Sequence, residues 1–162
     1  MSTEMEDRRP SSAAKDEGAS CWICFEDGPD ESGQQLRRDC SCRGESAGFA
    51  HISCLINYAK QKTEQWRTRD GIDKFIEPWR YCPGCKQDYQ NELAVDLANE
   101  VVSFVEEKYP DDQRKIVWAL YTKLEALRSG RHPKQREDAK GVANILFSVI
   151  GRMKIEDPSL PN

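Results

Sequence analysis

The chain has 162 residues, of which 38% are hydrophobic and 32% charged, and its formal net charge is −4. This polar composition leaves few apolar side chains for a core. We therefore expect one modest domain or two small ones, stabilised by additional cross-links. An acidic chain lacks the basic face that binding to a phosphate backbone requires, which excludes nucleic acid as the expected main partner. No apolar stretch approaches the length of a membrane-spanning helix, so no membrane span is expected.

The first half of the chain is predicted to be a tail followed by a small cysteine-rich domain. Residues 1–18 are rich in charge, Ser and Ala, so we expect a disordered tail. Residues 19–89 hold every cysteine and are expected to form an α+β domain.

Within this domain, residues 27–35 are predicted to be a loop. Residues 36–44 are predicted to be a short strand with Arg37 and Arg38 at a solvated edge. Residues 49–59 have helical spacing, whereas residues 61–80 are polar with a turn at 69–71.

The second half is predicted to be helical. Apolar residues recur at helical spacing within residues 93–105, 116–127 and 142–153. These stripes predict an all-α segment of about three helices over residues 91–155, arranged as an antiparallel bundle or a hairpin array. Gly141 and Gly151 weaken the third helix, because each Gly costs about 1 kcal/mol relative to Ala. His132 is interpreted as a solvated loop residue, and residues 156–162 as a tail.

Eight candidate zinc ligands lie in the cysteine-rich stretch, in four closely spaced pairs. They are Cys21 and Cys24, Cys40 and Cys42, His51 and Cys54, and Cys82 and Cys85. Such spacings let two side chains converge on one tetrahedral ion, and eight ligands complete two structural Zn²⁺ sites. Seven thiolates and two Zn²⁺ ions would change the formal charge from −4 to −7.

The cysteine count also bears on the compartment. Seven is an odd number, and no signal peptide is recognisable, so a disulfide framework is not expected. A reducing compartment, the cytoplasm or the nucleus, is expected instead.

The spacing of the pairs leaves their grouping open. In a sequential arrangement the first two pairs would share an ion, whereas in a cross-braced one the first pair joins the third and the second joins the fourth. Fifteen residues separate Cys24 from Cys40, eight separate Cys42 from His51, and twenty-seven separate Cys54 from Cys82. Loops of these lengths close in either arrangement.

The ligand order, four cysteines, one histidine and three cysteines, resembles the RING-CH (RING-variant) family of ubiquitin ligases over about residues 20–87. The single residue between Cys40 and Cys42 and the segment 51–55, His-Ile-Ser-Cys-Leu, are further points of similarity. The resemblance implies a cross-braced domain. It places the first ion on Cys21, Cys24, His51 and Cys54, and the second on Cys40, Cys42, Cys82 and Cys85.

Three features depart from the family pattern. The loop before His51 is one residue longer, at Glu45–Ser46, and the span before Cys82 is long. Transmembrane helices, which many relatives carry after the zinc domain, are not found, so a soluble variant is expected.

The resemblance also implies an activity. A RING-type ubiquitin ligase holds a ubiquitin-charged conjugating enzyme and promotes transfer to a substrate lysine without a covalent intermediate, which is catalysis by positioning. The expected use of all seven cysteines as metal ligands agrees with transfer without a covalent intermediate, because no cysteine is left to carry a ubiquitin thioester. By motif position the resemblance assigns contacts with the conjugating enzyme to Ile23, Leu55, Tyr58 and Pro83. Lys86 matches a basic linchpin to ubiquitin, although a plain surface charge is the alternative. A protein substrate is expected to bind the C-terminal helices.

Two other classes of function stay open. A PHD-type zinc finger, which binds a histone tail or another peptide, shares the ligand order and has an aromatic residue close to the position of Trp79. Glu26, Asp27 and Glu77 are available beside an aromatic cage. The pair and loop spacings favour RING-CH, and Trp66 and Trp79 are expected to be packing residues. A structural zinc scaffold that joins proteins through its helices is the third reading.

Overall fold

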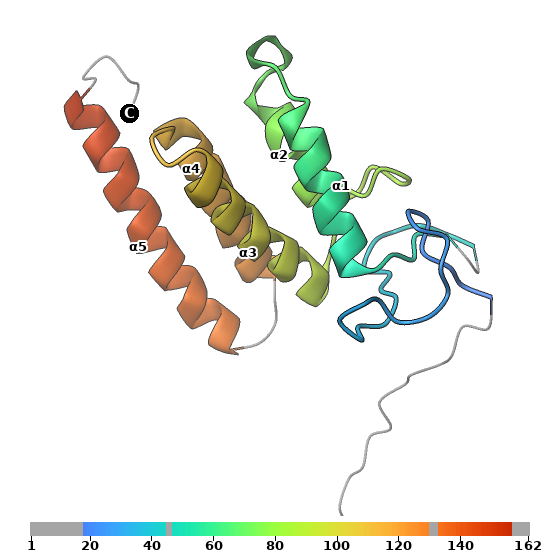
Figure 1. The fold of residues 1–162 in the computed structure, drawn as a ribbon. Coiled ribbons are helices and arrows are strands. Elements are labelled where there is room, and N and C mark those ends of the chain that lie inside the picture. Colours follow the sequence, from blue (N-terminus) through green and yellow to red (C-terminus); the bar gives the residue numbers. More distant parts are fainter. Residues whose placement is uncertain (1–17, 45–46, 130–132, 157–162) are drawn as a thin grey trace, which may run out of the picture.

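The computed structural model describes residues 18–44, 47–129 and 133–156. The described residues form helices α1 (Ile52–Glu64), α2 (Ile72–Arg80), α3 (Asn91–Lys108), α4 (Gln113–Ser129) and α5 (Pro133–Glu156), with a 3₁₀ turn at Thr68–Asp70. Residues 19–54 and 81–89, here called the zinc lobe, lie at one end of the molecule and α5 lies at the other (Figure 1). Most of the two predicted tails, the long loop at Glu45–Ser46 and His132 lie outside the described residues.

The predicted strand at 36–44 is absent. The described chain contains two isolated antiparallel bridges, Arg37 with Ala50 and Tyr81 with Asp88. The zinc lobe is therefore mostly loop, and its α+β character is not confirmed. Arg37 is also not at a solvated edge, because its guanidinium group lies 2.6 Å from Asp96 of α3 and 3.3 Å from Asp39.

Helix α1 begins directly after His51 and runs five residues past the predicted end. Its buried residues recur at helical spacing: Ile52, Leu55, Ala59 and Thr63. The following stretch, predicted to be polar with a turn, contains α2 as well. Gly71 makes the predicted turn with φ of 80°, and Pro78 lies inside α2. A nine-residue helix that contains Pro carries a weak sequence signal, so α2 was missed.

All three predicted C-terminal helices are present. Helix α3 packs on α4, and α4 packs on α5, so the three helices follow one another across the molecule (Figure 1). Helix α5 starts nine residues before its apolar stripe, at Pro133, and Pro is favoured at a first helical position. A side chain at Gly141 or Gly151 would meet no atom within 4 Å, so packing does not require glycine at either position.

Buried side chains connect the zinc lobe to the helices across the boundary predicted near residue 90. The first cluster contains Cys21, Ala50, Ile52, Leu55, Cys82 and Tyr89 of the lobe and α1, with Leu93 and Leu97 of α3. The second contains Ala59, Phe75, Ile76, Trp79, Val101, Phe104, Val105 and Ala119. Helix α3 contributes to both, so it is the element on which the zinc lobe and the helix pair α1–α2 are positioned.

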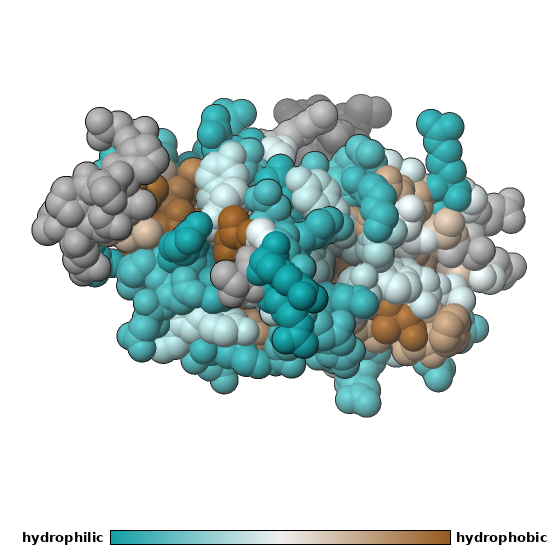
Figure 2. Space-filling model, turned by 90° about the horizontal axis from the view of Figure 1, so that it is seen from above, coloured by the Kyte–Doolittle hydropathy of each residue, from teal (hydrophilic) through white to brown (hydrophobic). Residues whose placement is uncertain are grey.

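One face of the molecule is mostly polar. Seen from above, hydrophilic residues cover most of the face in Figure 2, and the hydrophobic areas on it are small and separate. Among the described helices, none has the length and hydropathy needed to cross a bilayer.

Candidate metal centre

The structure brings the eight candidate ligands together in two groups of four. Cys21, Cys24, His51 and Cys54 form site 1, and Cys40, Cys42, Cys82 and Cys85 form site 2. Within each group the ligand atoms lie within 4.8 Å of one another. The first pair thus meets the third and the second meets the fourth, which is the interleaved arrangement that spacing alone left open.

The separations inside each group suit a tetrahedral zinc ion. Two sulfurs bound to one zinc at about 2.3 Å lie about 3.8 Å apart. The Cys42 and Cys82 sulfurs are 3.6 Å apart, and the Cys24 sulfur is 3.4 Å from Nδ1 of His51. A donor set of three thiols with imidazole and one of four thiols are both structural zinc sets. Two structural zinc ions therefore fit the chain, as the sequence predicted.

His51 is oriented for site 1 by its second ring nitrogen. Nε2 lies 2.7 Å from the carbonyl oxygen of Gly28, to which it donates, while Nδ1 faces the sulfurs of Cys24 and Cys54. A histidine that donates from one nitrogen presents the lone pair of the other, so this contact selects the tautomer that a metal needs. The ring is only 2% exposed.

Two similar turns present the Cys-x-x-Cys pairs. In the first, the backbone N–H of Phe25 donates to the carbonyl of Cys21 at 2.8 Å; in the second, that of Lys86 donates to Cys82 at 2.9 Å. Phe25 and Lys86 have φ of 65° and 60°, which is the left-handed region. They therefore occupy equivalent places, one on each zinc turn.

Gly48 is a residue of the site that the sequence analysis did not single out. Its φ is 80°, and a Cβ placed there would lie 2.7 Å from Cβ of Cys42 and 3.1 Å from the sulfur of Cys40. Any larger residue would push on site 2. A lone glycine in a loop carries no signal of such an approach in the sequence.

Asp30 is a second residue that was missed. Its carboxylate accepts hydrogen bonds from the backbone N–H groups of Ser32 and Gln34 and from the hydroxyls of Ser32 and Ser53. These donors, the Ser32 hydroxyl foremost, lower the pKa of Asp30 to about 2. Since Ser53 belongs to α1, Asp30 ties the loop that carries Gly28 to the helix that follows His51. The Asp-x-Ser pattern was a possible turn signal.

The thiols in each group differ in acidity. Burial, followed by contact with Cys24, raises the pKa of Cys54 to about 12, and burial followed by contact with Cys40 raises that of Cys42. In site 2 the backbone N–H of Gln87 lowers the pKa of Cys85 to about 7. In site 1 burial raises the pKa of Cys21, but backbone N–H groups outweigh it and bring the value to about 7. Buried thiolates repel one another, so full ionisation of either group requires a cation.

We therefore predict that zinc affinity falls steeply as the pH is lowered from 8 to 5, because every ligating thiol must lose a proton. Calorimetric titration at pH 7, in buffers of different ionisation enthalpy, is expected to show release of more than one proton per ion. Affinity independent of pH would contradict ligation by these thiols.

The residues expected to contact a conjugating enzyme differ in their solvent exposure. Ile23, Pro83 and Tyr58 are half-buried, and Lys86 is exposed. Leu55 is only 3% exposed and packs in the first core cluster, so its assignment as a contact is corrected to a core role. The Trp22 ring packs edge-on against Tyr58, with centroids 5.3 Å apart.

Two interleaved four-ligand groups define a cross-braced, two-metal zinc module. Residues 21–69 match the family model of the RING-variant domain, so this part of the chain is a RING-variant domain. No curated protein and no solved structure matches the chain. The family match ends before Cys82 and Cys85. These two ligands follow α2, which directs the chain back to site 2.

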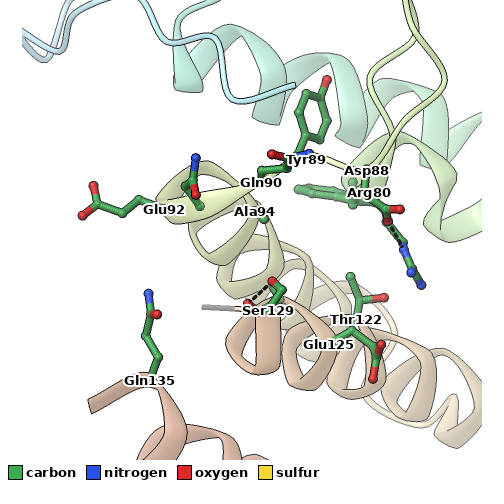
Figure 3. A pocket seen from close by; sticks show the side chains of 13 residues that line it. Arg80, Asp88, Tyr89, Gln90, Glu92, Ala94, Thr122, Glu125, Ser129 and Gln135 are labelled. Atoms are coloured by element: carbon green, nitrogen blue, oxygen red, sulfur yellow. Dashed lines mark hydrogen bonds and ion pairs between the residues drawn. The ribbon is translucent and has the colours of Figure 1, made fainter. Parts of the chain in front are cut away.

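A separate cavity of about 770 Å³ lies between the end of the zinc lobe and α4. Figure 3 shows its lining, in which Arg80 and Asp88 pair at 2.5 Å and Glu125 projects from α4. No candidate zinc ligand lines it, so this cavity belongs to the junction with the helices and not to the metal centre.

Proposed function

We propose that the protein is a RING-type ubiquitin ligase that docks a ubiquitin-charged conjugating enzyme and promotes transfer to a substrate lysine. The observation that carries the proposal is the interleaved pair of four-ligand sites in a domain of RING-variant type. Its role is positioning: the ligase restrains the charged enzyme in a reactive arrangement and supplies no nucleophile. All seven cysteines of the sequence lie in the two sites, which supports transfer without a thioester on this chain.

The docking groove is proposed to lie between the two zinc turns and α1. Ile23 and Pro83 would contribute apolar surface from the turns, and Tyr58 would contribute from the helix. Lys86 is proposed to be the linchpin, since it is exposed directly after the eighth ligand. A lysine provides a single point charge there, less pre-organised than the guanidinium group of an arginine.

The C-terminal helices are proposed to recruit the protein substrate. The exposed large hydrophobic residues of the described helices are Tyr121, Ile145 and Phe147. They lie on α4 and α5, away from the proposed docking groove. We propose that the protein acts in the cytoplasm or the nucleus, where thiols stay reduced.

A peptide reader of the PHD class is less well supported. Trp79, whose position favoured that reading, is 1% exposed and donates from Nε1 to Oγ1 of Thr63 at 2.7 Å. An aromatic cage formed by Trp66, Phe75 and Tyr109 is occupied by the chain's own Lys115, whose Nζ lies 4.7 to 5.6 Å from the three ring centroids. Neither aromatic group offers an open site for a histone lysine.

The test is ubiquitin transfer by the purified, zinc-loaded protein with a panel of conjugating enzymes. We expect chains with at least one enzyme. Ile23→Ala is expected to lower the rate by about 30-fold, as for an interface residue worth about 2 kcal/mol. Ile150→Ala makes the same truncation on α5, at the other end of the molecule (Figure 1), and is expected to leave the rate unchanged.

Two results would count against the ligase. One is silence across the whole panel from protein that carries two zinc ions. The other is equal loss of rate in the Ile23 and Ile150 variants, which would indicate a general effect on folding. Silence together with binding to a histone-tail peptide would favour the reader.

A further inference from the structure

Phe25 is an unusual residue for its place on the first zinc turn. It is 80% exposed, the most exposed of the large hydrophobic side chains in the described chain. Its φ of 65° is one that a bulky side chain adopts at a cost and that Gly or Asn tolerates better. Both hydration and backbone conformation therefore disfavour phenylalanine at this position.

Nothing inside the described chain compensates for these costs. Phe25 makes none of the ring contacts found for the other aromatic residues, and it belongs to none of the three buried clusters. Only its backbone has a structural role, as donor to Cys21, and any residue other than proline supplies that N–H group. The side chain is thus free for a contact outside the chain.

The position of Phe25 identifies the surface. It lies two residues from Ile23, beside Cys24, and it is the equivalent on the first zinc turn of Lys86 on the second. Phe25 therefore lies on the same zinc turn that contributes Ile23 to the proposed docking groove. Glu26 and Asp27 follow Phe25, and both are exposed and form no ion pair with the described residues.

We propose that Phe25 is a further anchor for the conjugating enzyme, an inference that rests on the proposed ligase function. The Phe25 ring fills an apolar depression on the conjugating enzyme, next to the part of that enzyme that occupies the docking groove. Glu26 and Asp27 face a basic rim on the same enzyme. Rigid aromatic side chains are typical anchors of interfaces, because they bury a large area at small entropic cost. Rim charges mainly raise the rate of association.

The decisive variant is Phe25→Asn, which should improve the local backbone energetics and remove the anchor. We expect two zinc ions per chain, an unfolding temperature at or above that of the wild type, and about tenfold weaker binding of the preferred conjugating enzyme. Ubiquitin transfer at subsaturating enzyme should fall by the same factor. Phe147→Asn removes another exposed phenylalanine, 72% exposed on α5 and outside the proposed docking groove, and should leave the affinity for the conjugating enzyme unchanged.

The outcomes separate this inference from the proposed function. Wild-type protein that binds and activates no conjugating enzyme overturns both. An active wild type with equal binding by Phe25→Asn overturns the anchor alone, and so does a loss of binding that accompanies zinc loss or a lower unfolding temperature.

A second experiment tests the contact of the two acidic residues with a basic rim on the conjugating enzyme. The double variant Glu26→Gln and Asp27→Asn should slow association at low salt and weaken the salt dependence of the association rate. An association rate unchanged by the double variant overturns the basic rim.

Discussion

Replacing Cys82 with Ser is expected to reduce the bound zinc from two ions to one and to open the zinc lobe. Cys82 is 3% exposed, and its sulfur lies among the other thiols of site 2. Serine lacks the thiolate that zinc requires, and a structural zinc ion contributes on the order of 10 kcal/mol to folding. Native mass spectrometry should count the ions.

Hydrogen exchange should locate the damage in the same variant. Cys82 belongs to the cluster that joins the lobe to Leu93 and Leu97, so protection should fall in the lobe and in the first half of α3. The cluster between α4 and α5 contains no ligand, and protection there should persist. Ser41→Ala, at an exposed position between two ligands, is the control and should keep both ions. Two ions in the Cys82 variant, with unchanged protection, would refute the role of site 2.

Replacing Trp79 with Ala is expected to lower the free energy of unfolding by about 3–5 kcal/mol. Trp79 is 1% exposed, and its ring lies 5.6 Å from that of Phe104 between centroids. The truncation leaves a cavity between α2 and α3 and removes a donor to Thr63, which is itself buried. Urea denaturation at a fixed, saturating zinc concentration measures the loss.

Two further variants show whether packing or the hydrogen bond dominates. Trp79→Phe keeps most of the buried aromatic volume while losing the donor, so its cost should be smaller. Trp66→Ala removes a half-buried indole whose N–H reaches the carbonyl of Gly71, and it too should cost less. A decrease of less than about 1 kcal/mol in the free energy of unfolding of Trp79→Ala would show that packing around Trp79 does not stabilise the position of α2.

The position of α2 explains how the chain accommodates a long span inside the metal-binding stretch. Twenty-seven residues separate Cys54 from Cys82, and the family match ends at residue 69. Helix α2 lies in this interval and packs against α1, α3 and α4, so it directs the chain back to site 2. Cys82 and Tyr89 then continue the packing onto Leu93 and Leu97 of α3.

Local patterns account for what the sequence alone established. Ligand identity follows from residue type and short spacing, because two or three residues suffice to bring a pair of side chains to one ion. The C-terminal helices follow from a 3.6-residue period. Both are properties of neighbouring residues, so the eight ligands and α3, α4 and α5 could be predicted without a structure.

Only the tertiary structure decided the features that join distant residues. Spacing left the grouping of the pairs open, and the resemblance favoured the cross-braced one that the folded chain adopts. Packing placed Leu55 in the core and gave Arg37 a partner in Asp96, fifty-nine residues away. Close approach made Gly48 necessary beside site 2. These outcomes depend on which surfaces meet in space, and a local pattern carries no information about that.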